Sequence, residues 1–213
     1  MPAEQSVIRK AVPEDAGQLA ELMNAAGEGL PAWLWSQMAG PAEDVMSFGA
    51  LRVAGTDSSF SYRNAHVAEL DGAIAGMLLG YQLDNPYDVS ALDDCPEVVR
   101  PLIELESRVP GSWYINAIAT VPAVRGQGIG SRLMQLAEDL AIRSRSNSLS
   151  LIVARDNDAA ARLYKRLGYH PVATRPIIGF PGCQHSGDWM LMTRDISPAP
   201  PSDLPGAAPG GQT

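Results

Sequence analysis

The segment 121–131, VPAVRGQGIGS, constrains the fold of this chain more than any other part of the sequence. Its glycines at 126, 128 and 130 stand between an apolar stretch typical of a β-strand and a stretch with the apolar spacing of an amphipathic helix. Glycine in such a connection lets another group approach the backbone closely. Free N–H groups at the start of the helix favour an anion there. The segment therefore predicts a strand–loop–helix unit that binds phosphate groups.

Two common glycine motifs fit this spacing poorly. A P-loop requires a lysine and then Ser or Thr after its last glycine, whereas Gly130 is followed by Ser131 and Arg132. A dinucleotide-binding motif that began at Gly126 would need a glycine at position 131, and it belongs near the first strand of a parallel unit. The glycine spacing thus disfavours a nucleotide-dependent oxidoreductase, which would bind NAD.

The hydrophobic patterns predict a mixed α/β domain over residues 1–196. Helical spacing follows a short N-terminal strand, and Asp71-Gly72 then joins two apolar stretches in the strongest short signal for a β-hairpin. Strand and helix patterns alternate afterwards, before two final strands. The expected strands are 6–11, 59–70, 73–83, 112–120, 148–154, 169–178 and 188–196, and the expected helices are 13–26, 33–38, 41–53, 96–108, 133–141 and 156–169.

Two segments stand apart from this pattern. Residues 84–111 carry seven acids and two arginines, and we interpret them as an insertion. Such a segment is either a solvated excursion over the surface or a lid over a substrate site, and long connections in compact domains are often functional. Residues 197–213 are rich in proline, glycine and alanine, which predicts a flexible tail.

Composition limits the partners. A formal net charge of −8 argues against a nucleic-acid partner, because a phosphate backbone needs a basic surface, and it suits a cationic substrate. The N-terminus is polar and no apolar stretch is long enough to span a bilayer, so we expect a cytoplasmic protein without a membrane partner. The histidines His66, His170 and His185 lack metal-ligand spacing, so no metal is expected. The oligomeric state stays open, a homodimer included.

Two motifs resemble those of the GNAT superfamily of N-acetyltransferases. The first, R/Q-x-x-G-x-G/A, is matched by Arg125, Gly128 and Gly130. The second, N-x-x-A-x-x-L-Y-x-x-x-G-F/Y, is matched by Asn157, Ala160, Leu163, Tyr164, Gly168 and Tyr169. The resemblance is specific for 115–170 and extends by element order to about 6–196. It implies a mostly antiparallel central sheet flanked by helices, and direct transfer of an acetyl group from acetyl-CoA to an amine.

The resemblance also implies site residues. Tyr164 matches the general acid that protonates the leaving sulfur. Asn157 has two open roles, as the cap of its helix and as a contact to the pantetheine arm. The backbone expected to bind the pantetheine arm and the diphosphate comprises Ile118, Ala119, Thr120, Arg125, Gly126, Gln127, Gly128, Ile129, Gly130 and Ser131.

The general base and the acceptor remain open at this stage. Some family members carry a glutamate at the position of Tyr114, so that mechanism does not transfer. Glu69, Asn116 and an acid from 84–111 are alternative candidates. The acceptor is the amine of a small molecule or a peptide, and the acidic insertion slightly favours a cationic acceptor such as a polyamine or an amino sugar. A non-catalytic module that senses or binds acyl-CoA on the same fold is the alternative function.

Overall fold

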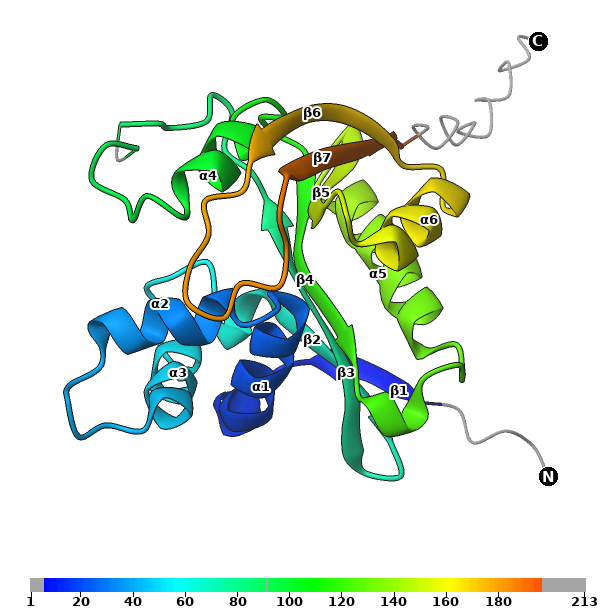
Figure 1. Cartoon of the computed structure of the whole chain (residues 1–213). Helices are drawn as coiled ribbons and strands as arrows, with labels where there is room; N and C mark the ends of the chain where they lie inside the picture. Colours follow the sequence, from blue (N-terminus) through cyan, green and yellow to red (C-terminus); the bar gives the residue numbers. More distant parts are fainter. Residues whose placement is uncertain (1–5, 91, 197–213) are drawn as a thin grey trace, which may run out of the picture.

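A seven-stranded sheet runs through the computed structural model, which describes residues 6–90 and 92–196 (Figure 1). The strands are β1 (Val7–Lys10), β2 (Ala65–Leu70), β3 (Ala73–Gln82), β4 (Trp113–Thr120), β5 (Ser148–Ala154), β6 (His170–Pro176) and β7 (Asp188–Asp195). The helices are α1 (Ala16–Ala26), α2 (Leu30–Met38), α3 (Val45–Ala54), α4 (Arg100–Glu106), α5 (Ile129–Arg143) and α6 (Asp158–Arg166).

The strand order is β1-β2-β3-β4-β5-β7-β6. Within these residues β4 and β5 form the one parallel pair, and the remaining neighbours are antiparallel. The mixed, mostly antiparallel sheet expected from the sequence is confirmed. The predicted tail, 197–213, lies outside the described residues.

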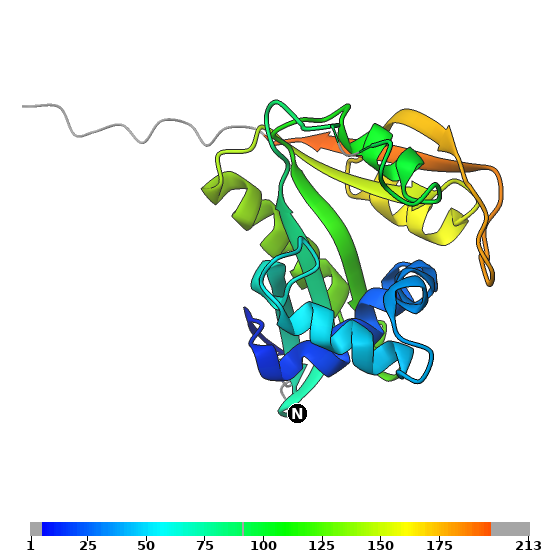
Figure 2. The same ribbon diagram turned by 90° about the vertical axis from the view of Figure 1, so that its left-hand side faces the viewer.

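Two hydrophobic cores cover the two faces of the sheet. Leu133 and Ala137 of α5 are fully buried against one face, together with Leu149 of β5. Leu19 of α1 and Val53 of α3 are fully buried against the other face. In Figure 2, α5 and the α1–α2 pair lie on opposite sides of β4. The 3.6-residue spacing of apolar residues that predicted these helices therefore corresponds to their buried stripes.

The β2–β3 hairpin corrects one sequence expectation. Asp71 and Gly72 both adopt positive φ angles, 54° and 77°, as a tight hairpin turn requires. The first strand is shorter than predicted, because residues 59–64 form a turn and a short 3₁₀ segment. The Ser61 hydroxyl donates to the carbonyl of Gly55 and accepts from the N–H of Arg63. These local bonds compete with strand pairing in a stretch that otherwise alternates as a strand would.

An irregularity in β4 shapes the centre of the molecule. Ala117 pairs with Leu79 and Ile115 with Gly80, so Asn116 is an extra residue that forms a β-bulge. Beyond the bulge β4 stays paired with β3 up to Thr120, whereas its pairing with β5 covers only Trp113 to Ile115. A bulge bends its strand and increases the local twist. The bulge thus coincides with the point where β4 and β5 diverge and open the sheet between them.

The connections outside the sheet complete the fold. Helix α4 lies within the acidic segment 84–111 and packs against β6 and β7. The connection between β6 and β7 extends toward α2 in Figure 1, where the Phe180 ring lies 5.7 Å from the Trp33 ring. None of the helices in the described residues is both long and apolar enough to cross a membrane.

Candidate active site

The glycine loop has the geometry that its spacing predicts. It leads from β4 through a 3₁₀ turn to Gly128, the residue that caps α5. Gly126 and Gly128 both have φ of +81°, a region that side chains disfavour. A Cβ added at either position would meet no atom within 4 Å. Glycine is therefore required by the backbone conformation, and the space above the loop is open.

The loop presents unsatisfied donors to this open space. The first N–H group bonded back into the α5 turn is that of Arg132, which donates to the Gly128 carbonyl at 3.1 Å. Among the described residues, the backbone N–H groups of 126–131 make no hydrogen bond to the backbone. They stand at the positive end of the α5 dipole, and the exposed Arg125 directly precedes them in the chain. This donor set fits a diphosphate.

The opening between β4 and β5 lies next to this loop. Ile118, Ala119 and Thr120 pair with β3 on one side, and they have no pairing with β5 on the other. Strand edges of this kind bind an extended ligand by backbone hydrogen bonds, as an added strand would. The residues predicted to bind pantetheine and diphosphate therefore lie consecutively along β4, the loop and the start of α5.

Helix α6 carries the two remaining predicted residues. Asn157 caps the helix, since its Oδ1 accepts from the Ala160 N–H at 3.1 Å, and its Nδ2 donates to Glu28 at 2.9 Å. The capping role is observed, and the contact to pantetheine stays a prediction. Tyr164 packs with its ring 5.9 Å from that of Tyr169, and its hydroxyl has no hydrogen-bond partner among the described residues. Burial raises the pKa of Tyr164, so the hydroxyl stays protonated.

The comparison with known proteins matches this arrangement. The model of the acetyltransferase (GNAT) family matches residues 33–169, which include the glycine loop and the Asn157–Tyr169 motif. The chain belongs to the GNAT family. This confirms the resemblance on which the site residues rest, and GNAT enzymes use acetyl-CoA as the acetyl donor.

Curated relatives share only part of this GNAT chain. N-alpha-acetyltransferase RimI of Mycobacterium tuberculosis is 38% identical over 66 residues, which is 31% of this chain and 40% of RimI. An uncharacterized protein of Mycobacterium leprae is 36% identical over 67 residues, 32% of this chain and 18% of that protein. The chain thus spans less than half the length of the curated relatives that it matches.

Solved structures share the fold at low sequence identity. A mosquito arylalkylamine N-acetyltransferase like 5b superposes with a TM-score of 0.64 at 16% identity, over 90% of this chain and 100% of that one. A Drosophila melanogaster polyamine N-acetyltransferase superposes with a TM-score of 0.61 at 17% identity, over 90% of this chain and 100% of that one. YncA of Salmonella typhimurium, solved with acetyl-CoA, superposes with a TM-score of 0.56 at 18% identity, over 93% of this chain and 99% of that one. These likenesses show the GNAT fold alone.

The candidates for the general base lie in different surroundings. Glu69 of β2 accepts from Arg9 at 2.7 Å, and β3 separates its strand from β4, so it is not brought to the opening. Asn116 lies at the bulge and donates to the Tyr81 hydroxyl at 3.2 Å. Of the acids in 84–111, Glu106 faces Tyr114 of β4.

A charged cluster near α6 was missed by the sequence. His185 of the β6–β7 connection contacts Glu28, which follows α1, and its Nδ1 lies 2.6 Å from Asp156, which precedes α6. The hydrogen bond from Asn157 to Glu28 joins this cluster to the α6 cap. Three separate loops supply the cluster, so no local motif could indicate it.

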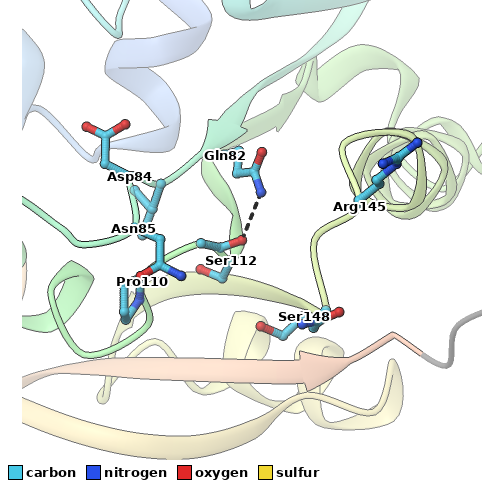
Figure 3. Close-up of a pocket in the computed structure, with 10 residues that line it drawn as sticks. Gln82, Asp84, Asn85, Pro110, Ser112, Arg145 and Ser148 are labelled. Atoms are coloured by element: carbon cyan, nitrogen blue, oxygen red, sulfur yellow. Dashed lines mark hydrogen bonds between the residues drawn. The ribbon is translucent and has the colours of Figure 1, made fainter.

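A cavity of about 390 Å³ lies away from the glycine loop (Figure 3). Ser112 and Ser148 place it next to the starts of β4 and β5, whereas the glycine loop follows the end of β4. The Gln82 side chain donates to the Gly111 carbonyl at 3.2 Å across its wall. The lining carries polar side chains and no unpaired buried group among the described residues. We therefore place the candidate active site at the opening between β4 and β5 rather than in this cavity.

Proposed function

We propose that this chain is an acetyl-CoA-dependent N-acetyltransferase that acts on the amine of a small molecule or a peptide. The observation that carries the proposal is the continuous surface formed by the unpaired edge of β4 and the donor-rich loop at the start of α5. Family membership supports the same chemistry. Acetyl-CoA supplies an acetyl group activated as a thioester.

The residues divide the binding task by chemistry. The N–H groups of Gly126, Gly128 and Gly130, aided by the α5 dipole and Arg125, bind the diphosphate. The β4 edge at Ile118–Thr120 binds the pantetheine arm by backbone hydrogen bonds. Holding the thioester and the amine together converts a bimolecular reaction into an effectively unimolecular one.

Tyr164 supplies the proton that the leaving thiolate of coenzyme A needs. Its hydroxyl is free of hydrogen bonds within the described residues, and burial keeps it in the protonated form. As the new C–N bond forms and the C–S bond breaks, the Tyr164 hydroxyl donates its proton to the departing sulfur. The amine nitrogen loses a proton to a base, and proton return through water restores the tyrosine.

Calorimetric titration with acetyl-CoA, with NADH as the control ligand, tests the proposal. We expect acetyl-CoA to bind and NADH not to bind, because the glycine spacing departs from the dinucleotide motif. An amine panel followed by thiol release then tests turnover. Binding without thiol release for every amine would favour the acyl-CoA-binding module, and the absence of binding would contradict the proposal.

A further inference from the structure

Three tyrosines surround one carboxyl group beside the opening in the sheet. Glu106, the last residue of α4, accepts a hydrogen bond from the Tyr87 hydroxyl at 2.6 Å and faces Tyr114 of β4. The Tyr81 ring of β3 meets the Tyr114 ring edge to face at 5.9 Å. Asn116 joins the group through its hydrogen bond to the Tyr81 hydroxyl. We call these five residues the Glu106 cluster.

The cluster lies at the point where β4 and β5 separate. Tyr114 belongs to the short paired part of these strands, and Asn116 is the bulge residue that follows it. Trp113 and Ile115 pack into the core beneath α5, so strand alternation directs Tyr114 to the opposite face. An acceptor that enters on this face would meet the cluster on the side of the sheet opposite α5.

Among residues 6–90 and 92–196, no cation pairs with this carboxyl group. Glu106 forms no ion pair within the described residues, whereas its neighbour Glu104 pairs with Arg175 of β6. A desolvated carboxylate without a cation is costly, and the hydrogen bond from Tyr87 offsets that cost in part. Desolvation accordingly raises the pKa of Glu106, while its tyrosine hydrogen bonds lower it. A carboxylate retained in such surroundings suits a cationic ligand.

The surroundings also suit an ammonium group in particular. Tyr81, Tyr87, Glu106 and Asn116 are half-buried, so the cluster keeps an open side. Aromatic rings attract cations through their faces, and the attraction grows as water is excluded. A carboxylate among aromatic rings therefore provides both a counter-charge and a desolvated wall for an alkylammonium ion.

We propose that the Glu106 cluster binds the acceptor as a protonated primary alkylamine and that the Glu106 carboxylate takes the proton that frees its nitrogen lone pair. This rests on the proposed function, and it assigns to the acidic segment both substrate recognition and the role of general base. This first step moves one proton: an N–H bond of the ammonium breaks and an O–H bond forms on Glu106, which passes the proton to water. The neutral amine is then able to attack the thioester. The second proton leaves the nitrogen for water after the attack, and Tyr164 supplies the proton that the sulfur gains.

Titration of the protein with n-butylamine at pH 7 and without acetyl-CoA tests the site directly. We expect butylammonium to bind and to shift the amide NMR signals of Tyr81, Tyr87 and Asn116, and we expect 1-butanol, its neutral analogue, not to bind. Glu106→Gln keeps the side-chain size and the oxygen that accepts from Tyr87, and it should weaken butylamine binding at least tenfold. Glu97→Gln, an exposed charge change in the same segment, is the control and should not weaken it.

The outcomes separate this proposal from the proposed function. Equal butylamine binding by the wild-type protein and Glu106→Gln, or shifts remote from the cluster, would overturn the ammonium site even if acetyl-CoA binds and thiol is released. Glu106-dependent butylamine binding would support the site even if acetyl-CoA fails to bind, in which case the proposed function fails. If Glu106→Gln does not fold, the butylamine titration of the wild-type protein tests the site. NMR shifts at Tyr81, Tyr87 and Asn116 would support it, and shifts elsewhere would contradict it.

Discussion

At the scale of single residues, Tyr164 shows how a helix stripe can serve packing and chemistry together. Its ring packs against the core beneath α5 and α6, while its hydroxyl has no protein partner among the described residues. A tyrosine with a purely structural role usually satisfies its hydroxyl when it is buried. Tyr164 is half-buried and its hydroxyl, unlike that of Tyr169, is not enclosed by protein atoms, so a ligand can reach it, and substitution separates the two roles.

Tyr164→Phe should lower kcat by about 10²-fold, because general acid catalysis contributes at least that much. The Kd for acetyl-CoA should stay nearly unchanged, since the diphosphate and pantetheine contacts belong to other residues. Thiol-release kinetics and calorimetry measure the two quantities. Tyr169→Phe is a matched control, because its neighbouring hydroxyl is buried without a partner in the described residues. Equal kcat values for both variants and the wild-type protein would mean that Tyr164 has a packing role alone.

Glu106 predicts a pH-dependent change in stability. Its pKa is raised on folding, mainly by desolvation, so folding favours the protonated form. Wild-type stability should therefore fall as pH rises from the ordinary glutamate pKa through the raised value, and level off above it. Glu106→Gln cannot lose this proton, so its Tm should exceed the wild-type Tm by more at pH 8 than at pH 4. Thermal unfolding at both pH values checks this, and a Tm difference independent of pH would contradict it.

At the scale of elements, the start of α5 combines two requirements in one short loop. The positive φ of Gly128 turns the chain from β4 into the helix, and the missing side chain keeps the space above it open. Gly72 in the β2–β3 hairpin has a similar φ and equally open space. We expect a ligand above Gly128 and none above Gly72, so the two glycines form a matched pair for mutation.

Gly128→Val should raise the Kd for acetyl-CoA at least tenfold, about 1.4 kcal/mol, because the side chain would enter the space proposed for the diphosphate. Gly72→Val imposes a comparable backbone cost in a hairpin far from the loop and should leave the Kd unchanged. Calorimetric titration of both variants gives the comparison. An equal loss of affinity in the two would mean that general destabilisation, and not a blocked site, explains the effect.

At the scale of the whole molecule, the sequence predicted what depends on local patterns. Apolar spacing indicated each helix and strand, and the glycine and Asn157–Tyr169 motifs indicated the family. The opening between β4 and β5 was not predictable from periodicity, because it coincides with one extra residue, Asn116, that only the pairing with β3 reveals. The Glu106 cluster was not predictable for a similar reason. It forms where α4, β3, β4 and the connection that carries Tyr87 meet, and no local spacing in the sequence indicates that contact.

Ligand binding should therefore be visible in the stability of the entire domain. A ligand that binds only the folded chain stabilises it by about 2.7 kcal/mol at 100 times its Kd. For a chain of this size, that corresponds to a rise in Tm of roughly 5–10 °C. We expect acetyl-CoA to produce this shift in the wild-type protein, since its proposed contacts bridge β4 and α5.

Thermal unfolding of the wild-type protein and Gly128→Val, each with acetyl-CoA or NADH, completes the test. The shift should appear with acetyl-CoA in the wild-type protein and shrink in Gly128→Val, whose loop is blocked. NADH shares a diphosphate with acetyl-CoA, so an equal shift with NADH would show that the loop recognises a diphosphate alone. A shift confined to acetyl-CoA would instead require contacts to the groups that NADH lacks, the pantetheine arm and the 3′-phosphate, and the β4 edge is the proposed contact for the pantetheine arm.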